Sequence, residues 1–207
     1  MSVDTENQVW FPWKRCRDGY KIREDDAGAL WIHPLSTNSE EITPLDDAAL
    51  FRRFANLDAG DFEAVLGFVN DTGLNSSALE PDPMGLWEVE IRKLSKAVDE
   101  WRRWDIDTLV VRFNDLNMAG AFNLRLGSQP RRSPPILFIE PRELFHALWA
   151  QFAHAVSRNE TQRQCDYCHR WYPPLTKRSQ FCSDKCRMAK SYRSHKSKQS
   201  MKKEKKS

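Results

Sequence analysis

The sequence predicts an α+β protein in which a mainly helical N-terminal domain with small β elements precedes a small cysteine-rich segment and a basic tail. Three observations predict this organisation. Apolar side chains recur at helical spacing through most of residues 43–104 and 141–159. Short alternating segments bounded by turn residues lie before and between these helical stretches. Four of the five cysteines fall within residues 165–186, and basic residues dominate the chain after them.

The composition excludes some classes of protein. With 40% hydrophobic and 11% aromatic residues the chain can build a core, so it is not disordered as a whole. Its purely apolar stretches reach only four residues, as at Ile136–Ile139, far below the roughly 18 residues of a membrane helix. The polar start, MSVDTENQ, predicts no signal peptide. We therefore expect a cytoplasmic protein without a membrane partner, whose cysteines stay reduced.

The net charge of +3 conceals a strong asymmetry. Residues 158–207 hold 15 Lys and Arg against 4 Asp and Glu, a net charge of +11. The first 157 residues hold 17 basic and 25 acidic residues, a net charge of −8. An acidic body joined to a basic end indicates a polyanionic partner or a disordered arm.

The elements of the first half follow from local signals. Residues 9–35 read as short strands and turns, and the polar residues 36–41 as a loop. Thr43 and Pro44 predict a helix start, with a helix over 45–57. Asp61 predicts the start of a second helix that ends near Gly73.

The second half is predicted in the same way. The expected elements are a loop at 75–83, a long amphipathic helix at 84–104, an ambiguous segment at 108–113, strands at 121–126 and 136–139, and a helix opened by Pro141 and running to about 159. Four tryptophans at helical positions are expected in the core rather than around a ligand: Trp87, Trp101, Trp104 and Trp149. The domains are accordingly placed at 1–157, 158–197 and, as a disordered basic tail, 198–207.

The cysteines have the spacing of a metal site. Cys165 and Cys168 are separated by two residues, and Cys182 and Cys186 by three. Zn²⁺ prefers four soft or borderline ligands in a tetrahedron, and residues four apart share one side of a helical turn. We predict one structural Zn²⁺ held by all four cysteines. A catalytic zinc is not expected, because four thiolates close its coordination shell. Redox activity of the first pair and four incidental thiols are the alternatives.

The residues between the pairs suggest a knuckle, a hairpin and a helix, the layout of a treble-clef-like zinc ribbon. The hairpin is expected between 170–172 and 179–181. His169 is expected to donate a hydrogen bond near the site rather than to replace a cysteine. Trp171 and Phe181 are expected in the small core of this segment, with stacking on bases as the alternative.

Four stretches carry a resemblance to a known family: AVLGFVNDTG (64–73), PRELFHALWAQFAHAV (141–156), RQCDYCHRWY (163–172) and FCSDKCRMAKSYRSHK (181–196). Their layout resembles a two-part bacterial family whose C-terminal zinc finger is named for a Cys-Gly-Asn-Arg (CGNR) signature. The resemblance implies a zinc finger and a stress-induced transcriptional regulator. Here Arg187, Met188 and Ala189 follow Cys186, so the ligand cysteine matches the family and the signature after it does not.

The basic end predicts nucleic-acid binding. Arg187, Lys190, Arg193 and Lys196 are spaced three apart and form one broad helical face suited to a phosphate backbone, for which we expect DNA. RNA or a ribosome is a second polyanion that this face could bind. The same residues are also compatible with a zinc-ribbon protein-interaction module without a nucleic-acid role, or with a tail that only aids solubility.

No enzyme is expected. Glu143 and His146 have the spacing of half a di-metal carboxylate site, but the chain has no second Glu-x2-His. A nucleophile elbow, a phosphate-binding loop and a dinucleotide fingerprint are also missing from the sequence.

Overall fold

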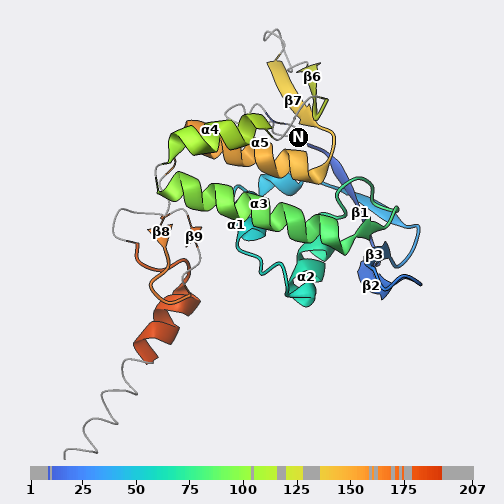
Figure 1. Ribbon diagram of the computed structural model, residues 1–207, viewed down its shortest axis with the longest axis horizontal. Helices are drawn as coiled ribbons and strands as arrows, with labels where there is room; N and C mark the ends of the chain where they lie inside the picture. The colour runs from blue at the N-terminus through green and yellow to red at the C-terminus, as the bar shows by residue number, and fades with distance from the viewer. Residues whose placement is uncertain are drawn as a thin grey trace, which may run out of the picture. The chain divides into compact units, whose positions relative to one another are not determined.

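The computed structural model describes residues 9, 11–103, 105–115, 120–127, 136–158, 160, 163–168, 171–172, 174 and 179–192 (Figure 1). The chain divides into two compact units. They are called here the N-terminal unit, Met1–Arg158, and the C-terminal unit, Asn159–Ser207. Helices and short antiparallel sheets together make the α+β fold that the sequence predicts.

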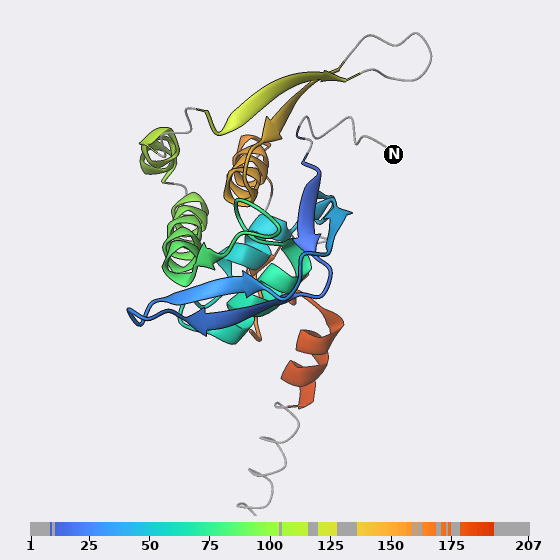
Figure 2. The ribbon, with the colours of Figure 1, turned by 90° about the vertical axis from the view of Figure 1, so that its right-hand side faces the viewer.

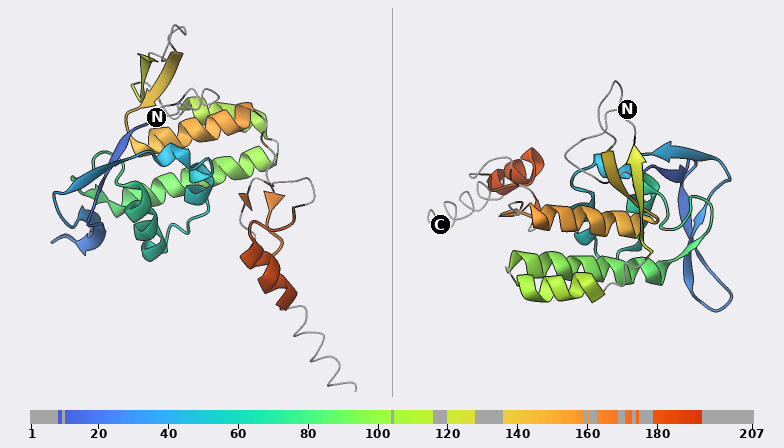
Figure 3. Two further views of the ribbon diagram at one scale, coloured as in Figure 1. Left: turned by 180° about the vertical axis from the view of Figure 1, so that it is seen from behind. Right: turned by 90° about the horizontal axis from the view of Figure 1, so that it is seen from above.

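Helices form the body of the N-terminal unit. They are α1 (Leu50–Ala55), α2 (Phe62–Thr72), α3 (Met84–Arg102), α4 (Ile106–Asp115) and α5 (Leu144–Ser157), with a short 3-10 helix, η1, at Pro44–Asp46. Helices α1, α3 and α5 pack on one another and α4 packs on α3. Figure 3 shows α5 alongside α3 and α4. In the described ranges, no helix is long and apolar enough to cross a membrane.

Three small sheets surround these helices. The strands are β1 (Trp13–Cys16), β2 (Tyr20–Glu24), β3 (Leu30–Pro34), β4 (Ser39–Ile42), β5 (Asp82–Pro83), β6 (Phe122–Gly127) and β7 (Ile136–Pro141). The antiparallel pairings are β1 with β4, β2 with β3, β3 with β5, and β6 with β7. Figure 2 shows the β2–β3 hairpin crossing one end of the helices and the β6–β7 hairpin projecting from them.

Two segments predicted as loops contain strands. The loop predicted at 36–41 is wrong from Ser39 onward, because β4 pairs there with β1. An ion pair of 2.8 Å between Arg15 Nε and Glu40 Oε1 lies across this pairing. Asp82 and Pro83, predicted as part of a loop, pair with β3. Both strands are polar and short, so their pairing depends on a partner strand that local patterns do not reveal.

The core of the N-terminal unit is aromatic. Trp87 on α3 is fully buried, and its ring lies 4.9 Å from the Phe145 ring and 6.1 Å from the Phe54 ring, measured between centroids. Trp101 and Trp149 are also buried, as predicted, while Trp104 lies outside the described residues. Edge-to-face ring pairs of this kind add to the free energy gained by burying apolar area.

Helix α2 follows its local signals. The Asp61 carboxylate accepts a hydrogen bond from the Ala64 N–H at 3.1 Å, which caps the helix where the sequence predicts its start. The helix ends before Gly73, whose φ is +85°. A Cβ at this position would lie 2.8 Å from the Lys14 carbonyl oxygen, so only glycine fits the turn. Helix α3 begins at Met84 as predicted, and the ambiguous segment around 108–113 is helical in α4.

Helices α1 and α5 begin later than predicted. Thr43 and Pro44 start only the 3-10 helix, and Pro141 ends β7. Neither α1 nor α5 has a cap from its own N-cap side chain. The caps come instead from residues that are distant in the sequence, which is why local start signals misplace both helices.

Each distant cap is a side-chain amide. Gln151 on α5 accepts a hydrogen bond from the Phe51 N–H at 2.9 Å and donates one to the Asp47 carbonyl at 2.9 Å, which closes the first turn of α1. The Asn75 side chain accepts a hydrogen bond from the Phe145 N–H at 2.9 Å, which closes the first turn of α5. The two helix starts are therefore held by the tertiary structure.

A buried carboxylate fixes the loop before α3. The Asp82 side chain is 3% exposed and accepts hydrogen bonds from the Asn75 N–H, the Ser76 hydroxyl and the Trp87 indole N–H. Burial raises the pKa of the Asp82 carboxyl above its ordinary value near 3.8, and these three donors oppose the rise. The carboxylate thereby ties the loop to the central tryptophan.

The C-terminal unit is small. Its described elements are β8 (Arg163–Gln164), β9 (Trp171–Tyr172) and a helix over residues 184–192, called here the C-terminal helix. Strand β9 pairs antiparallel with β8, and not with 179–181 as the sequence predicts. Residue 179 still adjoins the pair, because the Ser179 carbonyl accepts a hydrogen bond from the Tyr172 hydroxyl at 2.7 Å. The predicted tail at 198–207 lies outside the described residues.

Candidate metal centre

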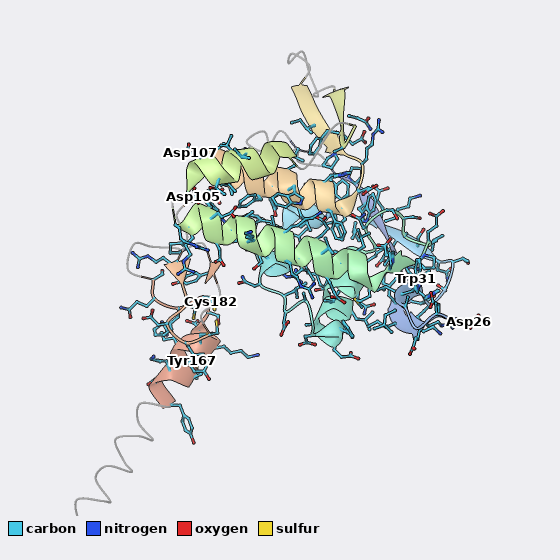
Figure 4. The ribbon with its side chains drawn as sticks, in the orientation of Figure 1. Asp26, Trp31, Asp105, Asp107, Tyr167 and Cys182 are labelled. Carbon is cyan, nitrogen blue, oxygen red and sulfur yellow. The ribbon has the colours of Figure 1, made fainter. Side chains whose placement is uncertain are left out.

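The C-terminal unit brings four cysteines together. Cys165 and Cys168 lie in the turn after β8, and Cys182 and Cys186 lie at the start of the C-terminal helix. Cys182 is labelled in Figure 4. The four Sγ atoms lie within 4.8 Å of one another. Within the described ranges, this is the one group of three or more His, Cys, Asp or Glu side chains that can hold a metal ion. It is called here the cysteine cluster.

The sulfur separations suit a metal better than a disulfide. The Sγ atom of Cys182 lies 3.6 Å from that of Cys168 and 3.5 Å from that of Cys186. A tetrahedron with metal–sulfur bonds of about 2.3 Å has sulfur–sulfur edges of about 3.8 Å, whereas a disulfide requires about 2.05 Å. All four cysteines are free thiols. The cluster therefore has the dimensions of a tetrathiolate metal site.

Backbone contacts hold the two pairs in place. The Ser183 hydroxyl accepts a hydrogen bond from the Cys186 N–H at 3.3 Å at the first turn of the C-terminal helix. The Asp166 N–H donates to the Gln180 carbonyl at 3.0 Å, which joins the turn carrying the first pair to the segment before the second. Lys190 Nζ donates to the Asp166 carbonyl at 3.2 Å, which joins the helix to the same turn.

The thiols differ in how readily they ionise. Burial raises the pKa of Cys165, but the backbone N–H groups of Cys168, Cys182 and Tyr167 stabilise its thiolate and bring the pKa down to about 6. Burial and hydrogen bonds with the other three thiols raise the pKa of Cys182 to about 12. A cation bound at the cluster would favour the thiolate form of all four cysteines.

Two of the four predicted nucleic-acid contacts lie on the described part of the C-terminal helix. Arg187 is exposed and forms an ion pair with Asp184 at 3.0 Å across one helical turn. Lys190 is exposed and donates to the Asp166 carbonyl, so part of its role is to hold the turn of the cysteine cluster. Arg193 and Lys196 lie outside the described residues, as does His169.

Sequence reasoning missed two exposed apolar side chains on the same helix. Met188 is 69% exposed and Tyr192 is 71% exposed, the highest values among the exposed large hydrophobic residues of the described part. Their separation of four residues was the available signal, since it places both on one helix side. Of the two aromatics considered from the sequence, Phe181 is half-buried and the Trp171 side chain lies outside the described residues. The neighbouring Tyr172, which was not considered, is buried.

The residues considered for catalysis do not form a metal site in the described ranges. Glu143 Oε2 accepts a hydrogen bond from the Asn75 side chain at 2.9 Å. The Nδ1 atom of His146 is buried and has no hydrogen-bond partner in the described part of the chain. Burial lowers the pKa of this imidazole below its ordinary value near 6.5, so the neutral form is favoured. Cys16, the fifth cysteine, is buried, and its thiol donates a hydrogen bond to the Ser36 carbonyl. It does not belong to the group of side chains that can hold a metal ion in the described residues.

Comparisons with known proteins give no match: no family model matches the chain, no curated protein matches it, and no solved structure matches it.

Proposed function

We propose that residues 158–197 form a structural zinc module, a treble-clef-like zinc ribbon, whose basic C-terminal segment binds nucleic acid. One observation carries the proposal: four thiols, from two pairs separated by thirteen residues, converge within 4.8 Å at the start of a helix. The basic residues follow directly from that helix, so folding around the metal presents them to a partner.

Zinc is the metal that the donor set favours. Four cysteine thiolates in a tetrahedron are typical of structural Zn²⁺, which has no redox chemistry of its own. Four protein ligands leave no open position for water or substrate, which supports a structural rather than a catalytic role. The hydrogen bond from the Asp166 N–H to the Gln180 carbonyl joins the turn of the first pair to the segment before the second, so metal binding and folding of the unit are coupled.

The charge distribution supports a nucleic-acid partner, and we expect DNA. Residues 187–207 hold nine basic residues and one acidic residue, whereas the first 157 residues carry a net charge of −8. A polyanion is repelled by the acidic part and attracted by the basic part, so contacts concentrate on the basic end. Each phosphate that it neutralises releases counterions, which makes the affinity depend steeply on salt concentration.

For this nucleic-acid-binding segment we propose a role in transcription regulation. Phosphate contacts alone do not distinguish sequences, so a regulator also needs side chains that read base edges. Arg187 and Lys190, on the C-terminal helix, are the candidates for this reading in the described residues. Lys190 would have to leave the Asp166 carbonyl to reach a base. Selection of bound sequences from random DNA tests this step, and recovery of unenriched sequences would contradict it.

The experiment for the metal compares two cysteine variants of the full chain. We expect one zinc per chain by metal analysis of the wild type and of Cys16→Ser, and loss of zinc in Cys182→Ser. Cys16 is the matched control because it is a buried free cysteine of the N-terminal unit. Purified wild-type protein without stoichiometric zinc would contradict the proposal.

The experiment for nucleic acid compares two charge variants of the full chain. Arg193→Gln with Lys196→Gln removes two basic residues after the cluster, and Lys21→Gln with Arg23→Gln removes two from β2. In a salt titration of duplex binding, the first pair of substitutions is expected to weaken binding and to reduce the slope of log K against log salt by about 1.8. Equal binding by both double variants would contradict the proposal and favour a module that binds protein.

A further inference from the structure

Met188 and Tyr192 form an exposed apolar face on the C-terminal helix, called here the Met188–Tyr192 face. The two side chains are one helical turn apart and are 69% and 71% exposed. Burying such side chains is favourable, and the C-terminal unit leaves both in water although its own core is small. Two adjacent, large and exposed apolar groups on a short helix indicate a surface for a partner.

The face is turned away from the metal site. Cys186 belongs to the cysteine cluster and Lys190 donates to the Asp166 carbonyl, so these two mark the inner side of the helix. Met188 and Tyr192 each follow one of them by two residues, a rotation of about 200° around the helix axis. A partner can therefore cover the face while the metal ligands stay in place.

Cations and a polar pair border the face. Lys185 precedes Met188 by three residues, and Arg187 is held beside it in the ion pair with Asp184. The chain that continues from Tyr192 adds basic residues and only one acidic residue up to Ser207. An apolar protein groove would have to accept this dense positive charge, whereas a nucleic acid offers both a flat apolar surface and negative charge.

The chemistry of the face distinguishes single strands from duplexes. A tyrosine ring stacks on the face of a base, and a methionine thioether packs well against aromatic edges. In a duplex both faces of each base are covered by neighbouring bases, so stacking needs an unpaired base. The flanking cations can follow the phosphates on either side of that base.

We propose that the Met188–Tyr192 face stacks on an unpaired base of single-stranded nucleic acid, with Tyr192 as the stacking ring. This inference rests on the proposed nucleic-acid function and names the form of nucleic acid that the C-terminal helix selects. Single-stranded DNA and single-stranded RNA share the base face and the phosphates, so both are expected to bind.

The test measures the affinity of the full-length, zinc-loaded protein for four oligonucleotides of equal length: single-stranded DNA, single-stranded RNA, duplex DNA, and an abasic strand that keeps the phosphates. The wild type is expected to bind both single strands about 5- to 150-fold more tightly than the abasic strand, the range for stacking one base. Tyr192→Ala is expected to bind the single strands as weakly as the abasic strand, and Tyr192→Phe to restore the difference.

Control variants separate stacking from folding. Zinc content is expected to be unchanged in Tyr192→Ala, because this ring is exposed and lies away from the cysteine cluster. Val111→Ala removes a 59% exposed apolar side chain from the N-terminal unit and is expected to leave all four affinities unchanged. Met188→Ala is expected to weaken single-strand binding without changing abasic binding.

The outcomes distinguish the two proposals. Equal affinity of the wild type for single, abasic and duplex strands would overturn the stacking inference and leave the nucleic-acid function in place. An affinity of Tyr192→Ala equal to that of the wild type would overturn it as well, and would assign the face to a protein partner. Binding to none of the four oligonucleotides would overturn the proposed function itself.

Discussion

The two units of the chain are held together by different means. The N-terminal unit buries an extensive apolar cluster that includes Trp87, Phe54 and Phe152. In the described part of the C-terminal unit, the buried residues are Cys165 and Tyr172. The larger unit can fold by burying apolar area, whereas a unit this small needs a further source of stability. In the described part of the C-terminal unit, a metal held by the cysteine cluster would take the place of a core.

Removal of the metal is expected to affect the folding of the two units most differently. Removal of zinc by a chelator, or Cys182→Ser, is expected to unfold the C-terminal unit, since structural zinc supplies about 10 kcal/mol or more of folding free energy. The N-terminal unit is expected to stay folded. Amide dispersion in two-dimensional NMR spectra, recorded with and without chelator, measures both at once. A C-terminal unit that keeps its dispersed signals without metal would show that it does have a sufficient core.

The next effect concerns the aromatic core. Trp87→Ala is expected to destabilise the N-terminal unit by about 3–5 kcal/mol, because it leaves a cavity and removes a donor to Asp82. Zinc content should not change. Denaturant unfolding followed by circular dichroism gives the free energy. Val89→Ala, on the exposed side of the same helix, is the control and should remain within about 0.5 kcal/mol of the wild type.

A smaller effect concerns the polar groups in the same core. Asp82→Ala leaves the Asn75 N–H and the Trp87 indole N–H buried without an acceptor and is expected to cost about 1–3 kcal/mol. Asp82→Asn keeps one oxygen for these two donors and offers its NH2 group to the Ser76 hydroxyl. We therefore expect Asp82→Asn to be close to the wild type, and a loss as large as that of the alanine variant would contradict this geometry.

Comparison of Asp82→Asn with the wild type also tests a pH dependence. The folded pKa of Asp82 is raised by burial above its ordinary value near 3.8. The stability from this shift is present below the unfolded pKa and is lost as the pH rises through the folded pKa. The free energy of unfolding of Asp82→Asn, relative to the wild type, should therefore increase from about pH 4 to pH 7. A constant difference across this range would argue against the shift.

The weakest of these effects lies in the C-terminal unit. Lys190→Ala removes the hydrogen bond to the Asp166 carbonyl and is expected to weaken zinc affinity by about 0.5–1.5 kcal/mol, the usual net value of such a bond. Lys185→Ala removes the same charge from the same helix and serves as the control. Competition with a chromogenic chelator measures both affinities. If the two variants weaken zinc binding equally, the effect belongs to the charge rather than to the hydrogen bond.

Local patterns predicted the elements whose stabilising contacts are local. The Asp61 cap, the apolar stripe of α3 and the spacing of the four cysteines all lie within a few turns of the residues they organise. The starts of α1 and α5 and the strand β4 were not predicted, because Gln151, Asn75 and β1 supply their partners from far along the chain. Tertiary contacts override local propensity at these places.

Local patterns also predicted only part of the candidate site. Cysteine spacing alone indicated the four thiols that the structure brings within 4.8 Å of one another, since two close pairs can supply the corners of a tetrahedron. The charge pattern indicated a basic helix, but it did not show that Lys190 would contact the Asp166 carbonyl or that Met188 and Tyr192 would stay exposed. Whether an apolar side chain enters a core depends on the size of that core, which spacing does not reveal.

The distant caps of α1 and α5 bear on the order in which the chain folds. The bond between Gln151 and Phe51 spans 100 residues, and the bond between Asn75 and Phe145 spans 70. Closing such long loops costs conformational entropy before the hydrogen bonds that offset it can form. We therefore expect both caps to form late in folding. During synthesis the Gln151 cap of α1 therefore cannot form until α5 has left the ribosome. The four thiols of the cysteine cluster span only residues 165–186, so bringing them together closes a much shorter loop.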